Sequence, residues 1–358
     1  MRSLTSVYIN ATTIGSSTGD GRVGKEELAA LSEVSDVKLV LDAQKLRPEN
    51  YHQPYSVFLQ DYFAHTLIKQ SGEKFDLCHI YGNPYGVTTY VLQETGCRVI
   101  VTFLCHNRKM SIEEHEKWFG EYPFWHVKDD WGFELYTEHV RLADVIVSPS
   151  KYNTENIIRD VYGISRDKIV QIPHGCDIPP DVKPFPDKFT VGFLSQAGPD
   201  KGIPYLIQAW DQLGYTDSEL ILAGSGTEKL KPLIETLATH GNFRLLGRVP
   251  DPSDVYNNCS VFVLPSINES FGIPVIEAMA HGRPVITTRG CGASDAVEDG
   301  VDGFVVSPRN PSEIADYIQF FRENPLDMKK MGENARKKAM DYSWDKIRER
   351  YKEVYVKC

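Results

Sequence analysis

The feature that most constrains the fold of this chain is a regular alternation of short apolar runs with longer helical patterns. The runs at 98–104 and 260–264 are continuously rich in Val, Ile and Leu, as expected for parallel strands buried on both faces. The expected strands are 4–11, 36–41, 75–80, 98–104, 144–148, 168–172, 189–194, 219–223, 242–246, 260–264, 284–288 and 303–306. Such alternation predicts an α/β fold with doubly wound parallel sheets.

A proline-dense segment divides the chain. Residues 173–187 contain five prolines and one glycine, which neither a helix nor a central strand tolerates. We therefore predict one domain over 1–172, a second over 173–342 and a closing helix over 343–358. The 358 residues suffice for two domains with separate cores. Ligands of such folds bind at the carboxyl ends of strands, so a cleft between the domains is the expected site.

Charge and composition exclude several classes of partner. The formal net charge is −10 and both halves are acidic, so no nucleic-acid-binding surface is expected. No apolar run approaches the roughly 18–20 residues that span a bilayer, and the N-terminus shows no signal-peptide core. The seven cysteines are scattered without a C-x-x-C pair, which is typical of reduced thiols. We expect a cytoplasmic protein, and contact with the inner face of the membrane stays open.

The segment 268–280 combines two carboxylates, Glu269 and Glu277, eight positions apart, with a helix start. Pro274 suits the first turn of a helix, which places Glu277 on that helix and Glu269 on the loop before it. The amides just before the proline would lie unpaired at the positive end of the helix dipole. We expect an anion site there, with one carboxylate on each side.

Two further side chains follow expected strands. Lys201 precedes a helix start, where its charge opposes the dipole unless an anion binds beside it; a solvated surface lysine is the alternative. His106 follows the buried run 99–105 and would face the crevice, unless it is a core histidine satisfied by the backbone. His174 lies in the proline-dense segment, and its role stays open.

Three glycine-containing turns also follow expected strands. They are residues 12–24, after which a helix is expected from Lys25, residues 223–226 and residues 247–250. Such turns let a backbone approach a phosphate closely, although tight or flexible turns explain each of them alone. No His, Cys, Asp or Glu set has metal-ligand spacing, and no Asp-x-Asp is present to hold an ion on a diphosphate. We expect neither a metal nor another cofactor.

Several segments together resemble one enzyme family. They are 145–150 (VIVSPS), 168–177 (KIVQIPHGCD), 264–266 (LPS), 269–282 (ESFGIPVIEAMAHG) and 284–286 (PVI). The chain resembles the retaining, nucleotide-sugar-dependent glycosyltransferases of family 4, also called group 1, most strongly from about Val145 onward. The resemblance implies the GT-B architecture, in which two Rossmann-like domains face each other across a cleft. The first would bind the acceptor, the second the donor, and the closing helix would cross back to the first.

Carried over by position, the resemblance implies roles for individual residues. Glu277 would hydrogen-bond the ribose hydroxyls of the nucleotide, and Glu269 would contact the transferred sugar near its reacting carbon. Lys201 would bind the diphosphate leaving group, and His106 would reach the donor sugar. Glu269, Lys201 and His106 are therefore the expected catalytic residues.

The resemblance also implies further donor contacts, many of them made by the backbone. The amides expected to bind sugar hydroxyls and diphosphate belong to Phe271, Gly272 and Ile273. The loop with Gly19 and Gly21 would approach the diphosphate from the other domain. The remaining contacts are Ser195, Gly224, Arg248 and Val249, of which the last two would meet the base.

One position departs from the family's pattern. The family usually has Gly-Arg shortly before the Lys-Gly, with the arginine on the phosphates. Here Phe193 follows Gly192, and no arginine stands before Lys201 in this segment. Either Lys201 carries more of the charge or Ser195 contributes a hydroxyl. The family's acidic residue after a later glycine turn is Asp295 in this chain.

The expected reaction transfers a hexosyl group from a UDP- or GDP-sugar to a hydroxyl, with retention of configuration and without a metal. The acceptor would be a glycan, a lipid-linked saccharide or a small molecule. Two alternatives stay open: a sugar-nucleotide epimerase or phosphorylase on the same fold, and a sugar-nucleotide-binding protein without transferase activity. The sequence leaves the donor, the acceptor, the linkage and the oligomeric state undecided.

Overall fold

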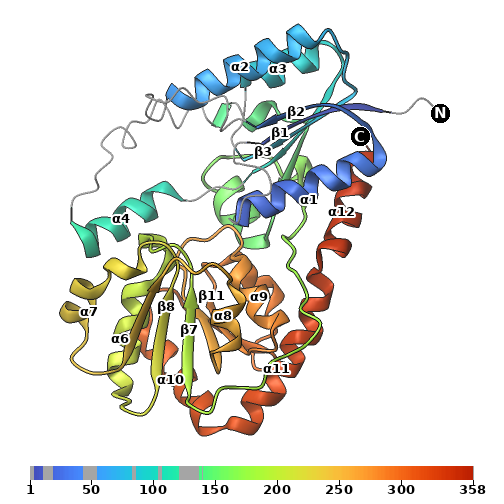
Figure 1. Cartoon of the computed structure of the whole chain (residues 1–358). Helices are drawn as coiled ribbons and strands as arrows, with labels where there is room; N and C mark the ends of the chain where they lie inside the picture. Colours follow the sequence, from blue (N-terminus) through green and yellow to red (C-terminus); the bar gives the residue numbers. More distant parts are fainter. Residues whose placement is uncertain are drawn as a thin grey trace.

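The strands of this protein form two separate parallel sheets, one above the other in Figure 1. The computed structural model describes residues 4–10, 19–42, 55–82, 86–103, 107–120, 137–138 and 140–357. We call the parts built on the first and the second sheet the N-terminal and the C-terminal domain. The predicted α/β fold with doubly wound parallel sheets is confirmed.

The first sheet is built from the N-terminal half. Its strands are β1 Thr5–Asn10, β2 Asp36–Asp42, β3 Leu77–Tyr81, β4 Arg98–Thr102, β5 Val145–Ser148 and β6 Ile169–Gln171. Its described strands lie in the order β2-β1-β3-β4-β5-β6, all parallel. The longer described helices are α1 Gly19–Val34, α2 Tyr55–Ser71, α3 Gly86–Glu94 and α4 Arg108–Phe119, and a π-helical segment follows at Asn153–Arg159.

The second sheet has the order β12-β11-β10-β7-β8-β9, again all parallel. Its strands are β7 Thr190–Leu194, β8 Glu219–Ala223, β9 Phe243–Gly247, β10 Val261–Leu264, β11 Val285–Thr288 and β12 Gly303–Val306. The helices are α6 Ile203–Leu213, α7 Lys231–Leu237, α8 Ser253–Asn257, α9 Ile273–Ala280, α10 Pro311–Glu323, α11 Pro325–Ala339 and α12 Trp344–Lys357. In the described part of the chain, no helix is long and apolar enough to cross a membrane.

Each sheet reverses its strand order beside its first strand. In the second sheet the reversal lies between β7 and β10, and in the first it lies between β1 and β3. Loops that leave two such strands at their carboxyl ends turn in opposite directions and leave a crevice between them. These two places are therefore where the fold offers a binding site.

The start of α1 corrects one prediction. The sequence predicts a loop over 12–24 and a helix from Lys25, whereas the helix begins at Gly19. Glycines disfavour helix interiors, which led the prediction to a later start. Gly24 lets α1 pack closely on β1, because a Cβ there would lie 2.1 Å from Nδ2 of the buried Asn10.

The proline-dense segment that joins the sheets is anchored to the C-terminal domain. The fully buried Arg283 donates from Nη2 to the carbonyl oxygens of Lys183 and Pro184, and from Nε to that of Tyr256. Its guanidinium carbon lies 4.6 Å from the ring centroid of Phe185. Where the first domain ends within this segment stays a prediction, as does the predicted boundary at residue 343.

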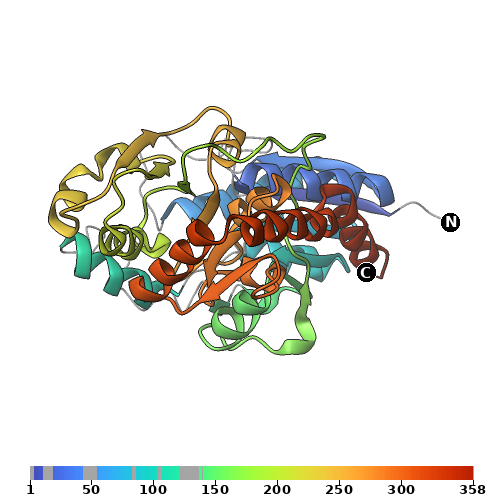
Figure 2. The same ribbon diagram turned by 90° about the horizontal axis from the view of Figure 1, so that it is seen from below.

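α12 crosses back to the N-terminal domain, as predicted. Figures 1 and 2 both show it running from α11 to lie alongside α1. The residues on its buried face are Trp344, Ile347, Tyr351 and Tyr355. At its edges Arg348 pairs with Glu26, and Lys352 pairs with Glu33 at 2.6 Å.

A buried polar network lies beneath α1 and α12. Glu27 of α1 accepts hydrogen bonds from the hydroxyls of Tyr8 at 3.0 Å and Thr102 at 2.7 Å. Because Thr102 donates to Glu27, Nε2 of His79 donates to Thr102, and its Nδ1 accepts from Tyr355. Burial raises the pKa of Glu27 to about 7 and lowers that of His79 to about 3. The network joins α12 to α1 and to the first sheet.

Candidate functional site

The loops after β7 and β10 meet at the reversal of the second sheet. The loop after β7 ends in a short 3₁₀ turn, Pro199–Lys201, and Gly202 follows as the N-cap of α6 with a φ of 68°. A Cβ on Gly202 would lie 2.0 Å from the carbonyl oxygen of Pro265, in the loop after β10. Glycine therefore lets the two loops touch, which brings Lys201 to Glu269.

Lys201 and Glu269 form an ion pair between Nζ and Oε2. The two side chains are only 18% and 13% exposed. Burial alone would lower the pKa of Lys201, but the charge and the hydrogen bond of Glu269 outweigh it and raise that pKa. The ammonium is therefore charged at neutral pH. The sequence predicts both residues for the site but does not reveal that they pair.

α9 starts one residue before the predicted position, and its first turn lies beside Glu269. Gly272 is the N-cap, with a φ of 97°. A Cβ on Gly272 would lie 2.6 Å from Sγ of Cys291 and 3.4 Å from Cγ of Glu269. Phe271 and Ile273 on either side are buried. The first amides of a helix have no partner within it, so this helix start, with Lys201 nearby, suits an anion.

Glu277 lies one turn into α9 and is 5% exposed. The phenol of Tyr256 donates to its Oε2 at 2.6 Å, and Nη1 of Arg22 pairs with its Oε1. Since Arg22 belongs to α1, this ion pair joins the two domains. Burial lowers the pKa of Arg22, but Glu277 outweighs that effect and raises it. Sequence reasoning missed Arg22; the available signal was its place in the glycine-rich stretch after the first strand.

His174, whose role the sequence leaves open, lies against the site. Its ring is edge-on to that of Phe271, with centroids 5.2 Å apart, and its buried Nδ1 has no hydrogen-bond partner among the described residues. Burial lowers the pKa of His174 to about 3, against a smaller opposite effect of Glu269. The imidazole is therefore neutral.

The N-terminal domain supports the loop after β10 from behind. Ser150 Oγ donates to the carbonyl oxygen of Ser270 at 2.7 Å. The backbone amide of Lys151 donates to Oδ2 of Asp295 at 2.6 Å. Burial raises the pKa of Asp295, and the bond and charge of Lys151 partly oppose that rise. Asp295, the residue singled out by the resemblance, thus binds the other domain in this structure.

α4 reaches over from the N-terminal domain to the C-terminal domain, as Figure 1 shows. The side-chain amide of Asn268 accepts from the backbone N–H of Asn107 at 3.2 Å and donates to its carbonyl oxygen at 3.1 Å. Farther along α4, the buried Glu114 pairs with Arg309 and accepts from the hydroxyl of Tyr205 at 3.0 Å. These contacts hold the domains together on the side of α6.

The turns after β7, β8 and β9 lie next to one another. A Cβ on Gly224, whose φ is 115°, would lie 2.0 Å from the carbonyl oxygen of Ser195. The amide of Gly224 donates to the carbonyl oxygen of Gly247 at 2.7 Å. Beyond Gly247, Arg248 is exposed and Val249 is half-buried. The structure therefore brings these predicted donor contacts to one edge of the sheet.

For three predicted residues the expected ligand contacts stay predictions. His106 lies outside the described residues, so its contact with a donor sugar stays a prediction. Gly19 and Gly21 lie in the first turn of α1 rather than in a loop, because that helix starts early. Their approach to a phosphate also stays a prediction.

Neither a metal centre nor a disulfide marks the described part of the chain. Within it, no group of three or more His, Cys, Asp and Glu residues is arranged to hold a metal ion. The described cysteines are buried free thiols: Cys78, Cys97, Cys176, Cys259 and Cys291. Burial raises the pKa of the last two to about 12. Metal independence itself stays a prediction.

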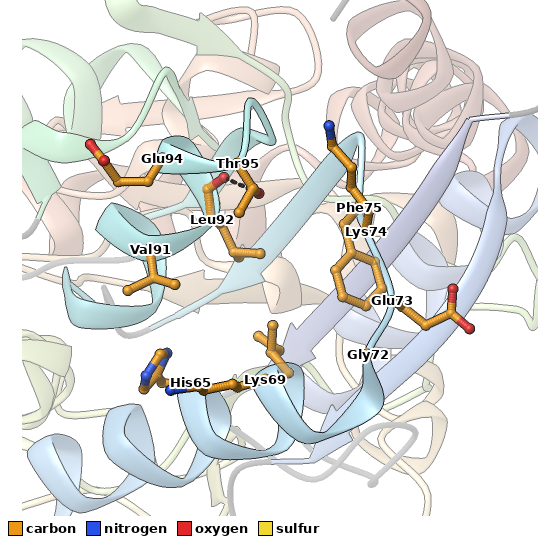
Figure 3. Close-up of a pocket in the computed structure, with 11 residues that line it drawn as sticks. His65, Lys69, Gly72, Glu73, Lys74, Phe75, Val91, Leu92, Glu94 and Thr95 are labelled. Carbon is orange, nitrogen blue, oxygen red and sulfur yellow. Dashed lines mark hydrogen bonds between the residues drawn. The ribbon is translucent and has the colours of Figure 1, made fainter.

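A separate cavity of about 870 Å³ lies between α2 and α3. Figure 3 shows His65 and Lys69 on one side of it, Val91 and Leu92 on another, and Phe75 facing them. Its lining includes residues just before β3 and β4, at the amino ends of the strands. The cavity is therefore distinct from the site described above, which lies at carboxyl ends.

Part of this chain matches a known protein family. Residues 177–338 match the family described as "Glycosyl transferases group 1". The capsular polysaccharide biosynthesis glycosyltransferase CapM of Staphylococcus aureus is 35% identical to this chain over 158 residues, which are 43% of this chain and 42% of CapM. The chain therefore matches less than half the length of this relative.

Solved structures resemble the whole chain. Sucrose-phosphate synthase from Thermosynechococcus elongatus has a TM-score of 0.78 at 17% identity, covering 99% of this chain and 98% of that one. HepE of Anabaena, in complex with UDP-glucose, has a TM-score of 0.74 at 18% identity, covering 99% and 100%. These likenesses confirm the predicted GT-B fold.

Proposed function

We propose that this chain, whose residues 177–338 form a glycosyl transferases group 1 domain, is a retaining glycosyltransferase that uses a nucleoside diphosphate sugar. One observation carries the proposal. The Lys201–Glu269 ion pair stands beside the N-terminus of α9, and Glu277 lies one turn further along that helix. A cation, a helix start and two carboxylates thus lie at the start of one helix, which suits a diphosphate between a sugar and a ribose.

The proposed roles follow that order. Glu277 accepts hydrogen bonds from the ribose hydroxyls, and the amides of Phe271, Gly272 and Ile273 bind the diphosphate and sugar hydroxyls. Lys201 binds the diphosphate, and Glu269 binds the sugar near its reacting carbon. The other proposed donor contacts are Ser195, Gly224, Arg248, Val249, His106, Gly19 and Gly21.

The proposed reaction needs stabilisation of two developing charges. The bond between the anomeric carbon and the diphosphate oxygen breaks, and its electron pair stays on that oxygen, where Lys201 and the helix amides stabilise it. The sugar becomes oxocarbenium-like beside the Glu269 carboxylate. The acceptor hydroxyl then attacks from the same face, and its proton passes to the leaving phosphate. This route retains configuration without a covalent enzyme intermediate or a metal.

A ligand screen followed by product analysis tests the proposal. HepE, a structural neighbour, was solved with UDP and with UDP-glucose, so UDP-sugars come first and GDP-sugars second. A specific donor at 100 times its Kd should stabilise the protein by about 2.7 kcal/mol in a thermal-shift assay. Glycosyl transfer to saccharide acceptors supports the proposal. Binding without hydrolysis or transfer to any acceptor would identify a non-catalytic sugar-nucleotide-binding protein.

Donor turnover without an acceptor separates the remaining alternative. An epimerase would convert the donor sugar with no acceptor present, and a phosphorylase would need inorganic phosphate. Either result would replace the transferase proposal while leaving the nucleotide site in place. Adding EDTA tests metal independence, and loss of activity that Mg²⁺ or Mn²⁺ restores would contradict it.

A further inference from the structure

Arg22 of the N-terminal domain enters the candidate site, where it pairs with Glu277. It lies in the first turn of α1, which follows β1 at the carboxyl edge of the first sheet. α1 is fixed by its packing on α12 and by the buried hydrogen bonds of Glu27. The backbone of Arg22 is therefore held at the site by the packing of α1, while its side chain can change rotamers.

The hydrogen bonding of Arg22 is incomplete. Its Nη1 pairs with Glu277, but its buried Nε has no hydrogen-bond partner among the described residues. A guanidinium carries five N–H donors in a planar fork that matches phosphate oxygens. A buried donor without a partner is unfavourable. A ligand oxygen that accepts from this Nε–H would remove that cost, which would strengthen binding of the ligand.

The position of the guanidinium relative to α9 indicates which ligand oxygens it can reach. Glu277 lies four residues after Ile273, about 6 Å along the helix axis at 1.5 Å per residue. A group held at Glu277 is thus about one helical turn from the helix start that we propose as the diphosphate site. An arginine side chain can cover that distance by changing rotamers.

The charges of the site also favour contact between Arg22 and a diphosphate. Lys201 and Arg22 are both ion-paired to carboxylates in this structure, Lys201 with Glu269 and Arg22 with Glu277. A nucleoside diphosphate brings further negative charge into this largely buried region. Both oxygens of Glu277 already accept hydrogen bonds, from Arg22 and Tyr256, so ribose hydroxyls would compete with Arg22 for this carboxylate.

We propose that Arg22 is a diphosphate-binding residue that rests on Glu277 while the site is empty. When a nucleoside diphosphate binds, the ribose hydroxyls take the place of the guanidinium on Glu277, and Arg22 turns onto the diphosphate. This inference rests on the proposed function, because it assumes that nucleotides bind along α9. It adds a cation from the N-terminal domain to the diphosphate site and replaces the interdomain pair with Glu277 by a contact to the ligand.

Calorimetric titration of UDP and uridine, with GDP and guanosine in parallel, tests the inference. Arg22→Ala should weaken binding of the diphosphate by about 10- to 100-fold, the range for a hydrogen bond to a charged group. Binding of the nucleoside should be unchanged or tighter, since Glu277 is then free of its competitor. Arg22→Lys, which keeps the positive charge, should lose less affinity for the diphosphate than Arg22→Ala. Arg322→Ala is the matched control, because it removes another arginine–carboxylate pair, with Asp217, on the surface of α10.

Several outcomes would overturn the inference. Equal weakening of nucleoside and diphosphate would mean that Arg22 only supports the structure, and a melting temperature far below that of the control would agree. Unchanged diphosphate binding in Arg22→Ala, together with weakened binding in Lys201→Ala, would reject the inference but leave the proposed function standing. If the folded wild-type protein binds neither UDP nor GDP, the proposed function itself is rejected, and the inference about Arg22 with it.

Discussion

Two buried glutamates on helices, Glu27 and Glu277, have similar surroundings and different partners. Each accepts a hydrogen bond from a tyrosine hydroxyl, from Tyr8 and Tyr256 respectively. Glu277 also pairs with a guanidinium, whereas Glu27 has hydroxyl donors and a neutral histidine. Burial accordingly raises the pKa of Glu27 to about 7. The difference separates a carboxyl group that holds helices together from one that, in the proposed function, exchanges a partner for the ribose.

The largest effect expected from this comparison is on the pH dependence of stability. The folded-state pKa of Glu27 is about 7 and its ordinary value is 4.5, so the folded state binds the proton more strongly. Its contribution is present below pH 4.5 and is lost as the pH rises through 7, a change of about 3 kcal/mol. Glu27→Gln should remove this dependence, measured as the difference between the two proteins in urea unfolding from pH 4.5 to 8. Parallel curves would contradict the assignment.

Lys201→Ala should lower turnover by about 100-fold or more, since it removes a preorganised charge at the leaving group. In free energy this is about 2.7 kcal/mol. Because the largely buried Glu269 then loses its partner, stability should fall as well, so kcat is compared on protein shown to be folded. Steady-state kinetics with saturating donor measure the effect. Lys231→Ala, which removes an exposed pair with Glu235, is the control, and equal kcat values in the two variants would reject the role of Lys201.

Glu277→Ala should weaken nucleotide binding by about tenfold, because the ribose hydroxyls lose a charged acceptor. Glu27→Gln should leave that affinity unchanged, which makes the two glutamates controls for each other. Calorimetry with the nucleoside alone is the cleanest measurement, since it omits the diphosphate. The distinction drawn above breaks down if both variants lose affinity to the same extent.

The smallest effect is expected at the edge of the α1–α12 contact. Arg348→Ala removes the pair with Glu26, which lies at the surface of the contact rather than in the network of Glu27. Such pairs contribute about 0–1 kcal/mol, so thermal unfolding should shift by only a few degrees. A loss of about 3 kcal/mol, as large as the change expected for Glu27, would mean that the edge, and not the network, attaches α12.

The sequence predicts this architecture well where the information is local. Continuous apolar runs predict the buried parallel strands, and the proline in 268–280 predicts the start of α9 to within one residue. The sequence also predicts Lys201, Glu269 and Glu277 as site residues, through the helix start and the family resemblance.

Contacts between distant segments could not be predicted in this way. Arg22 and Glu277 are 255 positions apart, and no periodicity relates them. Gly24 shows the same limit, since in isolation it indicates a loop, and only its contact with Asn10 explains why a helix contains it. The burial that determines the titration of Glu27 likewise depends on α12, which arrives from the other end of the chain.

The chain passes between the domains twice, and both passages meet at one point. The amide of Cys176 donates to the carbonyl oxygen of Tyr342 at 2.8 Å, and a Cβ on Gly175 would lie 2.5 Å from the ring of Trp344. In a rotation of one domain relative to the other, two adjacent passages would form the axis, and atoms would be displaced in proportion to their distance from it. Contacts close to the axis would persist through such a rotation, while the contacts farthest from it would separate first. A larger side chain at Gly175 would clash with Trp344 and would therefore disturb the packing at this axis.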